Sequence, residues 1–194
     1  MINASGIRTT AELLQAMTIQ GKAIAFNASS CEKDITHTFK TNGGHCPQCR
    51  TANIGYALRE YKTAFIYIVG SKKTRLLKVG LINDIEKRER SLNSINSKYA
   101  NCNDWEMIFY AKTLKAGKIE RMIHEKLSRF QDTIQYEKTD GLHDGKELFR
   151  CSYNRAKKAI DQVQAENKIE FLLAREKSSI VDNYQFPSIA NLIF

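Results

Sequence analysis

The sequence predicts an α+β fold, in which a small three-stranded antiparallel sheet is flanked by helices and preceded by a small cysteine-rich module. Over residues 62–150, stretches with strand character alternate with stretches of helical spacing. Ahead of them, three of the five cysteines lie within residues 31–49. A hydrophobic content of 42% in 194 residues is enough for one packed domain with a small satellite module.

The N-terminal part is expected to contain a helix followed by the cysteine-rich module. Residues 8–20 have helical character, with Thr9 or Thr10 as N-cap and Glu12 in the first turn. The glycine pair Gly43–Gly44 precedes the last two clustered cysteines. We expect three parts in all: residues 1–60 with this helix and module, 61–165 as the main domain, and 166–194 as a C-terminal helix with an apolar tail.

The strand signal is clearest at TAFIYIVG, which is rich in β-branched and aromatic residues and stops at Gly70. A second strand, LLKVGLI, follows after only five polar residues, so the two strands must form an antiparallel hairpin. If the loop centres on Lys72–Lys73, Tyr67 lies opposite Lys78 on the same face. Directly opposed Cβ atoms are about 4.5–5.5 Å apart, so a phenol and an ammonium would meet there.

The remaining elements are expected in chain order. They are a helix IEKRERSLNS capped by Asn83 or Asp84, a third strand Trp105–Thr113, a helix over residues 117–130, a short strand or helix lead-in at GKELFRCS, and a helix over residues 152–177. The chain ends in the apolar stretch IVDNYQFPSIANLIF, which either packs back on the domain or serves a partner.

Composition favours a polyanionic partner and argues against membrane, secreted and disulfide-rich proteins. Thirty Lys and Arg against 21 Asp and Glu give a formal charge of +9, which favours a polyanionic partner. No apolar run approaches the ~20 residues that cross a bilayer, and the N-terminus lacks a secretory pattern. Five cysteines, an odd number, argue against a disulfide framework. We therefore expect a soluble, cytoplasmic protein.

The hairpin and the residues after it resemble the GIY-YIG nuclease superfamily. FIYIVG followed by LKVGLI is similar to the paired motif that names the family. The resemblance covers residues 64–165 and points to the KIG-type bacterial and phage branch, because Lys78 stands where the second motif has tyrosine. The matching positions, in the expected order, are Tyr67, Gly80, Arg88, the pair Glu120 and His124, and Glu147.

The resemblance implies a metal-dependent DNA endonuclease that hydrolyses phosphodiester bonds. Tyr67 would be the general base, and a cation at Lys78 would lower its pKa from the ordinary value near 10. Glu147 would hold one Mg²⁺ or Mn²⁺, and Arg88 would bind two phosphate oxygens through its planar fork. His124 is a further candidate catalytic residue.

Other interpretations of these residues stay open. Arg90 lies in the same charged run as Arg88, although the spacing from Gly80 favours Arg88. Glu120 and His124 are four residues apart on one helix face, which favours a structural hydrogen-bonded pair over a catalytic one.

The cysteine-rich module has the spacing of a structural zinc site. Cys46 and Cys49 form a C-x-x-C knuckle, and Cys31 lies 15 residues upstream of it. The fourth ligand is His37 or His45, and His37 is favoured because adjacent residues such as His45 and Cys46 seldom share one tetrahedral ion. The segment resembles treble-clef and ribbon modules of bacterial and phage nucleases. The alternative is a pair of reduced cysteines, whereas a redox motif would need a βαβ context.

The leading hypothesis is therefore a site-specific endonuclease of the type II restriction kind, acting on double-stranded DNA. Cutting both strands needs two active sites, which implies a homodimer or a higher oligomer, and no membrane is involved. Alternatives are a phage or mobile-element nuclease of the same fold and a non-catalytic zinc-containing nucleic-acid-binding protein. A redox or metallochaperone protein would leave the residues after 60 unexplained.

Overall fold

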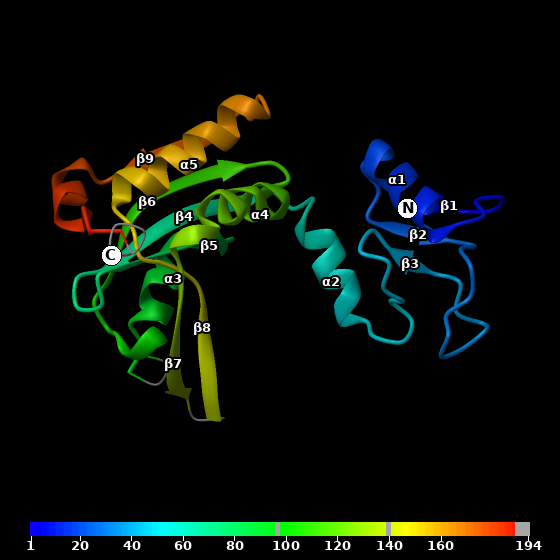
Figure 1. Cartoon of the computed structure of the whole chain (residues 1–194), viewed down its shortest axis with the longest axis horizontal. Helices are drawn as coiled ribbons and strands as arrows, with labels where there is room; N and C mark the ends of the chain where they lie inside the picture. Colours follow the sequence, from blue (N-terminus) through cyan, green and yellow to red (C-terminus); the bar gives the residue numbers. More distant parts are fainter. Residues whose placement is uncertain (96–97, 139–140, 189–194) are drawn as a thin grey trace. The chain divides into compact units, whose positions relative to one another are not determined.

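The computed structural model describes residues 1–95, 98–138 and 141–188 and divides into two compact units, Met1–Lys62 and Thr63–Phe194 (Figure 1). Each unit has its own core and is treated separately. Among the described residues, no helix is both long enough and apolar enough to cross a membrane.

The first unit contains a three-strand sheet and two helices. Its elements are β1 (Ile2–Asn3), α1 (Thr10–Gln20), β2 (Ile24–Phe26), β3 (Lys40–Thr41) and α2 (Ala52–Arg59), and the strand order is β1-β2-β3. The predicted N-terminal helix is confirmed. Thr9 is its N-cap and forms a capping box with Glu12, so two otherwise unpaired backbone N–H groups are satisfied. Gly21 ends the helix in the left-handed conformation, with φ 61°. Leu13 and Met17 bury the inner face of α1.

The second unit is built on a six-strand sheet in which every neighbouring pair is antiparallel. Its order is β7-β8-β5-β4-β6-β9. The strands are β4 (Ala64–Ser71), β5 (Leu76–Ile82), β6 (Trp105–Thr113), β7 (Gln131–Lys138), β8 (Gly141–Phe149) and β9 (Leu173–Glu176). The α+β class and the three expected strands, β4 to β6, are confirmed. The expected size of the sheet was wrong. The expected short strand or helix lead-in at GKELFRCS is the end of β8. The strands β7 and β9 and the first part of β8 are polar and largely exposed, so they lack the apolar alternation that marks a strand in sequence.

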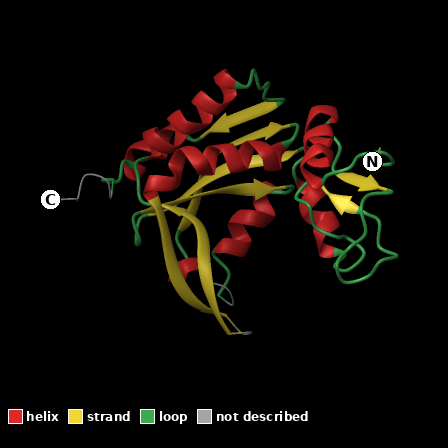
Figure 2. Ribbon diagram, turned by 45° about the vertical axis from the view of Figure 1, so that its right-hand side comes forward, coloured by secondary structure: helices red, strands yellow, loops and turns green. Residues whose placement is uncertain are grey.

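Helices cover both faces of the central strands. The helices α4 (Ala116–Leu127) and α5 (Tyr153–Glu166) lie on one face, and α3 (Ile85–Leu92) lies on the other (Figure 2). Alternate residues of the strands divide between two cores. Ile66 and Val79 pack on the α4/α5 face. Tyr67 packs on the α3 face. Beyond this body, β7 and β8 continue as a long hairpin (Figure 1). The α3 face therefore carries the residues singled out at the hairpin.

The C-terminal region differs from the expected continuous helix over residues 152–177. The helix α5 ends at Glu166, and β9 then pairs with β6. A 3₁₀ helix, Ser178–Tyr184, follows. Its last residue, Tyr184, is fully buried, and the Tyr184 hydroxyl donates to Glu106 Oε2 at 2.7 Å. The ring fills the space over Gly70, where a Cβ would lie 2.3 Å from it. This part of the tail thus packs back on the sheet, and residues 189–194 lie outside the described residues.

Candidate active site and cysteine–histidine cluster

The register of the β4–β5 hairpin differs by two residues from the expected one. Tyr67 pairs with Gly80, and Val69 pairs with Lys78. Tyr67 and Lys78 therefore share a face as diagonal neighbours, not as a directly opposed pair. The cause is the turn, which begins after the Ser71–Leu76 pair and contains Arg75 in the left-handed region at φ 54°. That turn centres one residue later than the expected Lys72–Lys73 loop.

Tyr67 is bonded to Arg88 from the first helix after the hairpin. Its side chain is fully buried, and Arg88 Nε donates to its hydroxyl oxygen at 2.7 Å. The Asp84 side chain caps α3 by accepting from the backbone N–H of Lys87, so Asp84 is the N-cap. Gly80 leaves room for the tyrosine, because a Cβ there would lie 2.7 Å from the hydroxyl oxygen.

The electrostatics of Tyr67 differ from the expectation as well. Burial raises the pKa of the Tyr67 phenol above its usual range, and the neighbouring Arg88 guanidinium opposes that rise. Tyr67 is therefore a neutral phenol at moderate pH. The cation beside Tyr67 is Arg88. The expectation that Lys78 lowers the pKa of Tyr67 was wrong. Lys78 has a different partner.

Lys78 forms an ion pair with Glu147. Its side chain is buried, and Lys78 Nζ lies 2.6 Å from Glu147 Oε2 and 3.4 Å from the Lys146 carbonyl oxygen. Burial lowers the pKa of the Lys78 ammonium, and the Glu147 carboxylate opposes that fall. The Glu147 side chain is 33% exposed, so it is partly open to solvent.

Glu147 occupies a β-bulge. Asp132 pairs with Leu148 and Ile134 with Gly145, so Lys146 and Glu147 together face the single residue Thr133. Glu147 has φ 64°, a left-handed conformation that costs a residue other than glycine about 1 kcal/mol or more. Bulges often change the direction of a side chain beside an active site. Here the bulge lies where the Glu147 carboxylate meets the buried Lys78 ammonium of β5.

Tyr99 is a member of this group that the sequence did not reveal. Its hydroxyl donates to the Lys146 carbonyl, and Lys78 Nζ lies 5.0 Å from the centre of its ring. Burial raises the pKa of the Tyr99 phenol, which keeps the donated proton in place. Tyr99 and Lys78 thus hold the same carbonyl of the bulge. The residue lies in a short 3₁₀ helix, Tyr99–Asn101, within a polar stretch, and its only sequence signal is an aromatic residue among polar neighbours.

Glu120 and His124 lie on α4, at the edge of β5. The His124 Nε2 atom lies 3.0 Å from the Val79 carbonyl oxygen, the geometry of a hydrogen bond that the imidazole donates. The ladder between β5 and β8 ends at Lys78, so His124 satisfies the next backbone carbonyl of that edge. Glu120 is 6% exposed; burial is the main cause of the raised pKa of Tyr67 and the lowered pKa of Lys78, and the Glu120 charge adds to the former and opposes the latter. The expected pairing of Glu120 with His124 stays a prediction.

A family model of the T5orf172 domain matches residues 64–164, which is more than half of the 194-residue chain. The chain belongs to the T5orf172 domain family. This domain is related to the GIY-YIG-like nuclease domain. The match begins with β4 and ends inside α5, so the T5orf172 domain contains Tyr67, Lys78, Arg88 and Glu147. Neither the curated proteins nor the solved structures contained a match to the chain.

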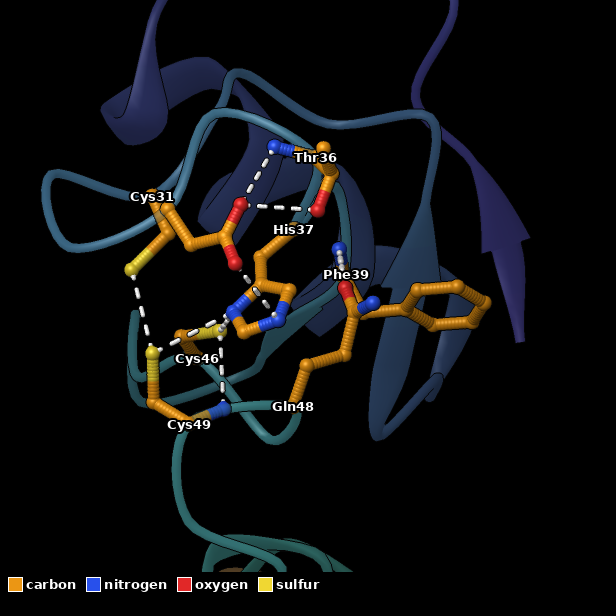
Figure 3. Close-up of polar contacts among 8 residues, drawn as sticks. Cys31, Thr36, His37, Phe39, Cys46, Gln48 and Cys49 are labelled. Carbon is orange, nitrogen blue, oxygen red and sulfur yellow. Dashed lines mark hydrogen bonds and ion pairs between the residues drawn. The ribbon is translucent and has the colours of Figure 1, made fainter.

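Outside the T5orf172 domain, the first unit brings Cys31, His37, Cys46 and Cys49 together, with their ligand atoms all within 4.8 Å of one another (Figure 3). Cys49 Sγ lies 3.4 Å from Cys31 Sγ and 3.3 Å from His37 Nδ1. A tetrahedral zinc ion with Zn–S bonds of about 2.3 Å and Zn–N bonds of about 2.0 Å needs ligand separations of about 3.5–3.8 Å. The donor set suits such an ion and the two separations are within about 0.5 Å of those values, so this group could bind zinc.

The structure also distinguishes the two histidines that were candidates for the fourth ligand. His37 points into the cluster, and its Nε2 lies 3.4 Å from Asp34 Oδ2 (Figure 3). The Asp34 carboxylate is held by Thr36, whose backbone N–H and hydroxyl both donate to Oδ1. A carboxylate on the second ring nitrogen is typical of histidines that ligate a metal. His45 is not part of the group, and its backbone N–H donates to Thr41 Oγ1.

Proposed function

We propose that this protein is a metal-dependent DNA endonuclease that hydrolyses phosphodiester bonds at specific sites, as type II restriction enzymes do. The observation that carries the proposal is the presence, on one face of the sheet, of a buried tyrosine bonded to a half-buried arginine and of a lysine–glutamate pair. These are Tyr67 with Arg88 and Lys78 with Glu147. The relation of the T5orf172 domain to GIY-YIG-like nucleases supports the same chemistry.

Glu147 would hold the catalytic ion, Mg²⁺ or Mn²⁺. The fit rests on its carboxylate, which belongs to a partly exposed side chain and has one oxygen bonded by Lys78. Magnesium is bound through one or two carboxylates and keeps several waters, so a single glutamate is sufficient. When bound, the ion supplies an activated water and neutralises developing negative charge. Lys78 and Tyr99 position this carboxylate through the Lys146–Glu147 bulge.

Arg88 would bind the scissile phosphate. The Arg88 Nε atom is committed to Tyr67, which fixes the plane of the guanidinium and leaves the two terminal nitrogens to meet phosphate oxygens. In the free protein, Tyr67 therefore positions Arg88. Proton acceptance by Tyr67, as the family resemblance implies, requires its pKa to fall when substrate binds, because burial raises that pKa in the free protein.

The cluster of the first unit would hold a structural Zn²⁺ through Cys31, His37, Cys46 and Cys49. Its role would be to fold residues 1–62, where the core is small. Cutting both DNA strands requires two active sites, so the active form would be a homodimer or a higher oligomer.

The test is incubation of the protein with duplex phage DNA and Mg²⁺ or Mn²⁺, followed by sequencing of the fragment ends. Discrete ends in a common sequence are expected, with no product from Glu147→Gln. The matched control is Glu137→Gln, an exposed glutamate on β7 that should leave cleavage unchanged. A smear would overturn site specificity. DNA binding without cleavage in either metal would overturn the nuclease proposal and favour a non-catalytic nucleic-acid-binding protein.

A further inference from the structure

A second charged feature of the T5orf172 domain lies on the opposite, α4/α5 face of the sheet. A cavity of about 230 Å³ opens between the end of α4, the following 3₁₀ helix Ser128–Phe130 and α5. Its floor is apolar and includes the buried Leu127, Phe130 and Ala159. Its rim is cationic and consists of Lys126, Arg129, Arg155 and Lys158, with Gln162 beside them.

The charges around this cavity are unbalanced. Four cationic side chains line it, and the lining includes no carboxylate among the described residues. Lys126 is compensated by Glu166 at 2.9 Å, which leaves Arg129, Arg155 and Lys158 as a local excess of three positive charges. Converging like charges destabilise a fold unless a counterion neutralises them. The cavity is therefore complementary to an anion.

The two arginines are held in place by one aromatic ring. The Arg129 guanidinium carbon lies 4.6 Å from the centre of the Phe130 ring, and that of Arg155 lies 5.8 Å from it. Phe130 is buried in the core, so the ring is a fixed platform for both side chains. Stacked guanidinium groups lose less freedom when they bind an anion, and their planar forks match phosphate oxygens.

The position of Arg155 goes against the usual preference of a helix. It lies in the first turn of α5, where the helix dipole favours acidic residues, and that turn contains none. Cations near the α4 C-terminus are explained by the dipole, but Arg155 and Lys158 are not. Residues that break a local rule without local compensation often serve a function. The N-terminal end of α5 adds its own positive potential to that of the arginines.

We propose that this cavity binds phosphate groups of a nucleic-acid backbone. Arg155, Lys158 and Gln162 follow one another at helical spacing along the exposed side of α5. From residue 155 to residue 162 the helix rises about 10 Å, more than one phosphate group spans. A chain of phosphates is therefore a better match than a single small anion. The choice of nucleic acid as ligand rests on the proposed function, but the site contributes affinity and not chemistry.

The experiment measures binding of a fluorescent DNA duplex by the full-length Glu147→Gln protein without divalent metal, over a series of salt concentrations. The test variant also carries Arg129→Gln, Arg155→Gln and Lys158→Gln. We expect it to bind every duplex more weakly, with a salt slope smaller by up to about 2.7, because each of the three phosphate contacts that are lost removes about 0.9 from the slope. The control carries Lys115→Gln, Lys118→Gln and Lys168→Gln, three exposed lysines around another cavity, and should keep the slope.

Equal losses in both triple variants would mean that only net charge matters and would overturn the proposal, as would an unchanged slope in the test variant. A thermal melt of each variant shows whether it is folded. If the test variant unfolds, Arg129→Lys with Arg155→Lys replaces it, and that variant must lose affinity while keeping net charge. Stabilisation by pyrophosphate without DNA binding would identify a small-anion site instead. If the test variant shows the smaller salt slope but the wild-type protein never cleaves DNA, this inference is sustained and the nuclease proposal is refuted.

Discussion

Replacing Glu147 by Gln should destabilise the protein as well as remove the proposed metal ligand. Lys78 is 1% exposed, and its ammonium would lose the carboxylate at 2.6 Å. Removing one partner of a fully buried pair costs about 3–5 kcal/mol. Since Glu147 is 33% exposed and glutamine still offers an acceptor, we expect a loss of about 2–3 kcal/mol. Lys78→Met should cost only about 1 kcal/mol, because water can still solvate the Glu147 carboxylate.

The two substitutions should not be additive. In the double variant neither charge is left unpaired, so its free energy of unfolding should be about 2 kcal/mol higher than the sum of the single losses predicts. Urea unfolding of the wild type, both single variants and the double variant completes the cycle. Cleavage measured on the same four proteins separates the roles, because the double variant should recover stability but not activity. Additivity within about 0.5 kcal/mol would refute the reasoning.

Three further predictions follow from the same geometry. Tyr99→Phe should lose about 1–2 kcal/mol of stability and need more Mg²⁺ for half-maximal cleavage. The control is Tyr136→Phe at the neighbouring ring, which should not change the Mg²⁺ dependence. The same Mg²⁺ dependence in both variants would contradict a positioning role for Tyr99. Burial raises the pKa of Tyr67 and Tyr99 above the unfolded value near 10. Their contribution to stability should therefore be complete below pH 10 and be lost as the pH rises further. A urea unfolding midpoint that stays constant from pH 9 to 11.5 would reject this prediction. Removal of zinc by a chelator should raise amide exchange throughout residues 1–62 and leave residues 63–194 protected; protection of both units would argue against a structural zinc.

Much of the fold could be predicted from the sequence where the signals are local. Thr9 and Glu12 form a capping box, and the predicted helix follows it. The strands β4, β5 and β6 are mainly apolar and were predicted. By contrast, β7 and β8 are polar and form a ladder mainly with each other, so the evidence for them lies in their pairing. The strand β9 is four exposed residues, and only its partner β6 makes it a strand.

The candidate site was predictable as a set of residues but not as a set of contacts. The register of the hairpin depends on its turn, and a shift by two residues replaced Lys78 by Gly80 opposite Tyr67. The pairing of Lys78 with Glu147 joins residues that are 69 positions apart. It also depends on a β-bulge that no local sequence pattern predicts. Tyr99 contributes through a backbone carbonyl, so its identity alone could not reveal it. The placement of His37 beside the cysteines follows the simple rule that adjacent residues seldom share one ion.

The central claim is that the Arg88 guanidinium, held by Tyr67, binds the phosphate during cleavage. Its most direct test is the single-turnover rate of DNA cleavage by Arg88→Ala compared with Arg90→Ala. Both arginines lie on α3, but Arg88 is bonded to Tyr67 whereas Arg90 is exposed and its Nε donates to the Glu86 carbonyl. The structure predicts a loss of about 100-fold or more for Arg88→Ala, as when one transition-state donor is removed, and no loss for Arg90→Ala. Undiminished cleavage by Arg88→Ala, or a loss confined to Arg90→Ala, would contradict the account.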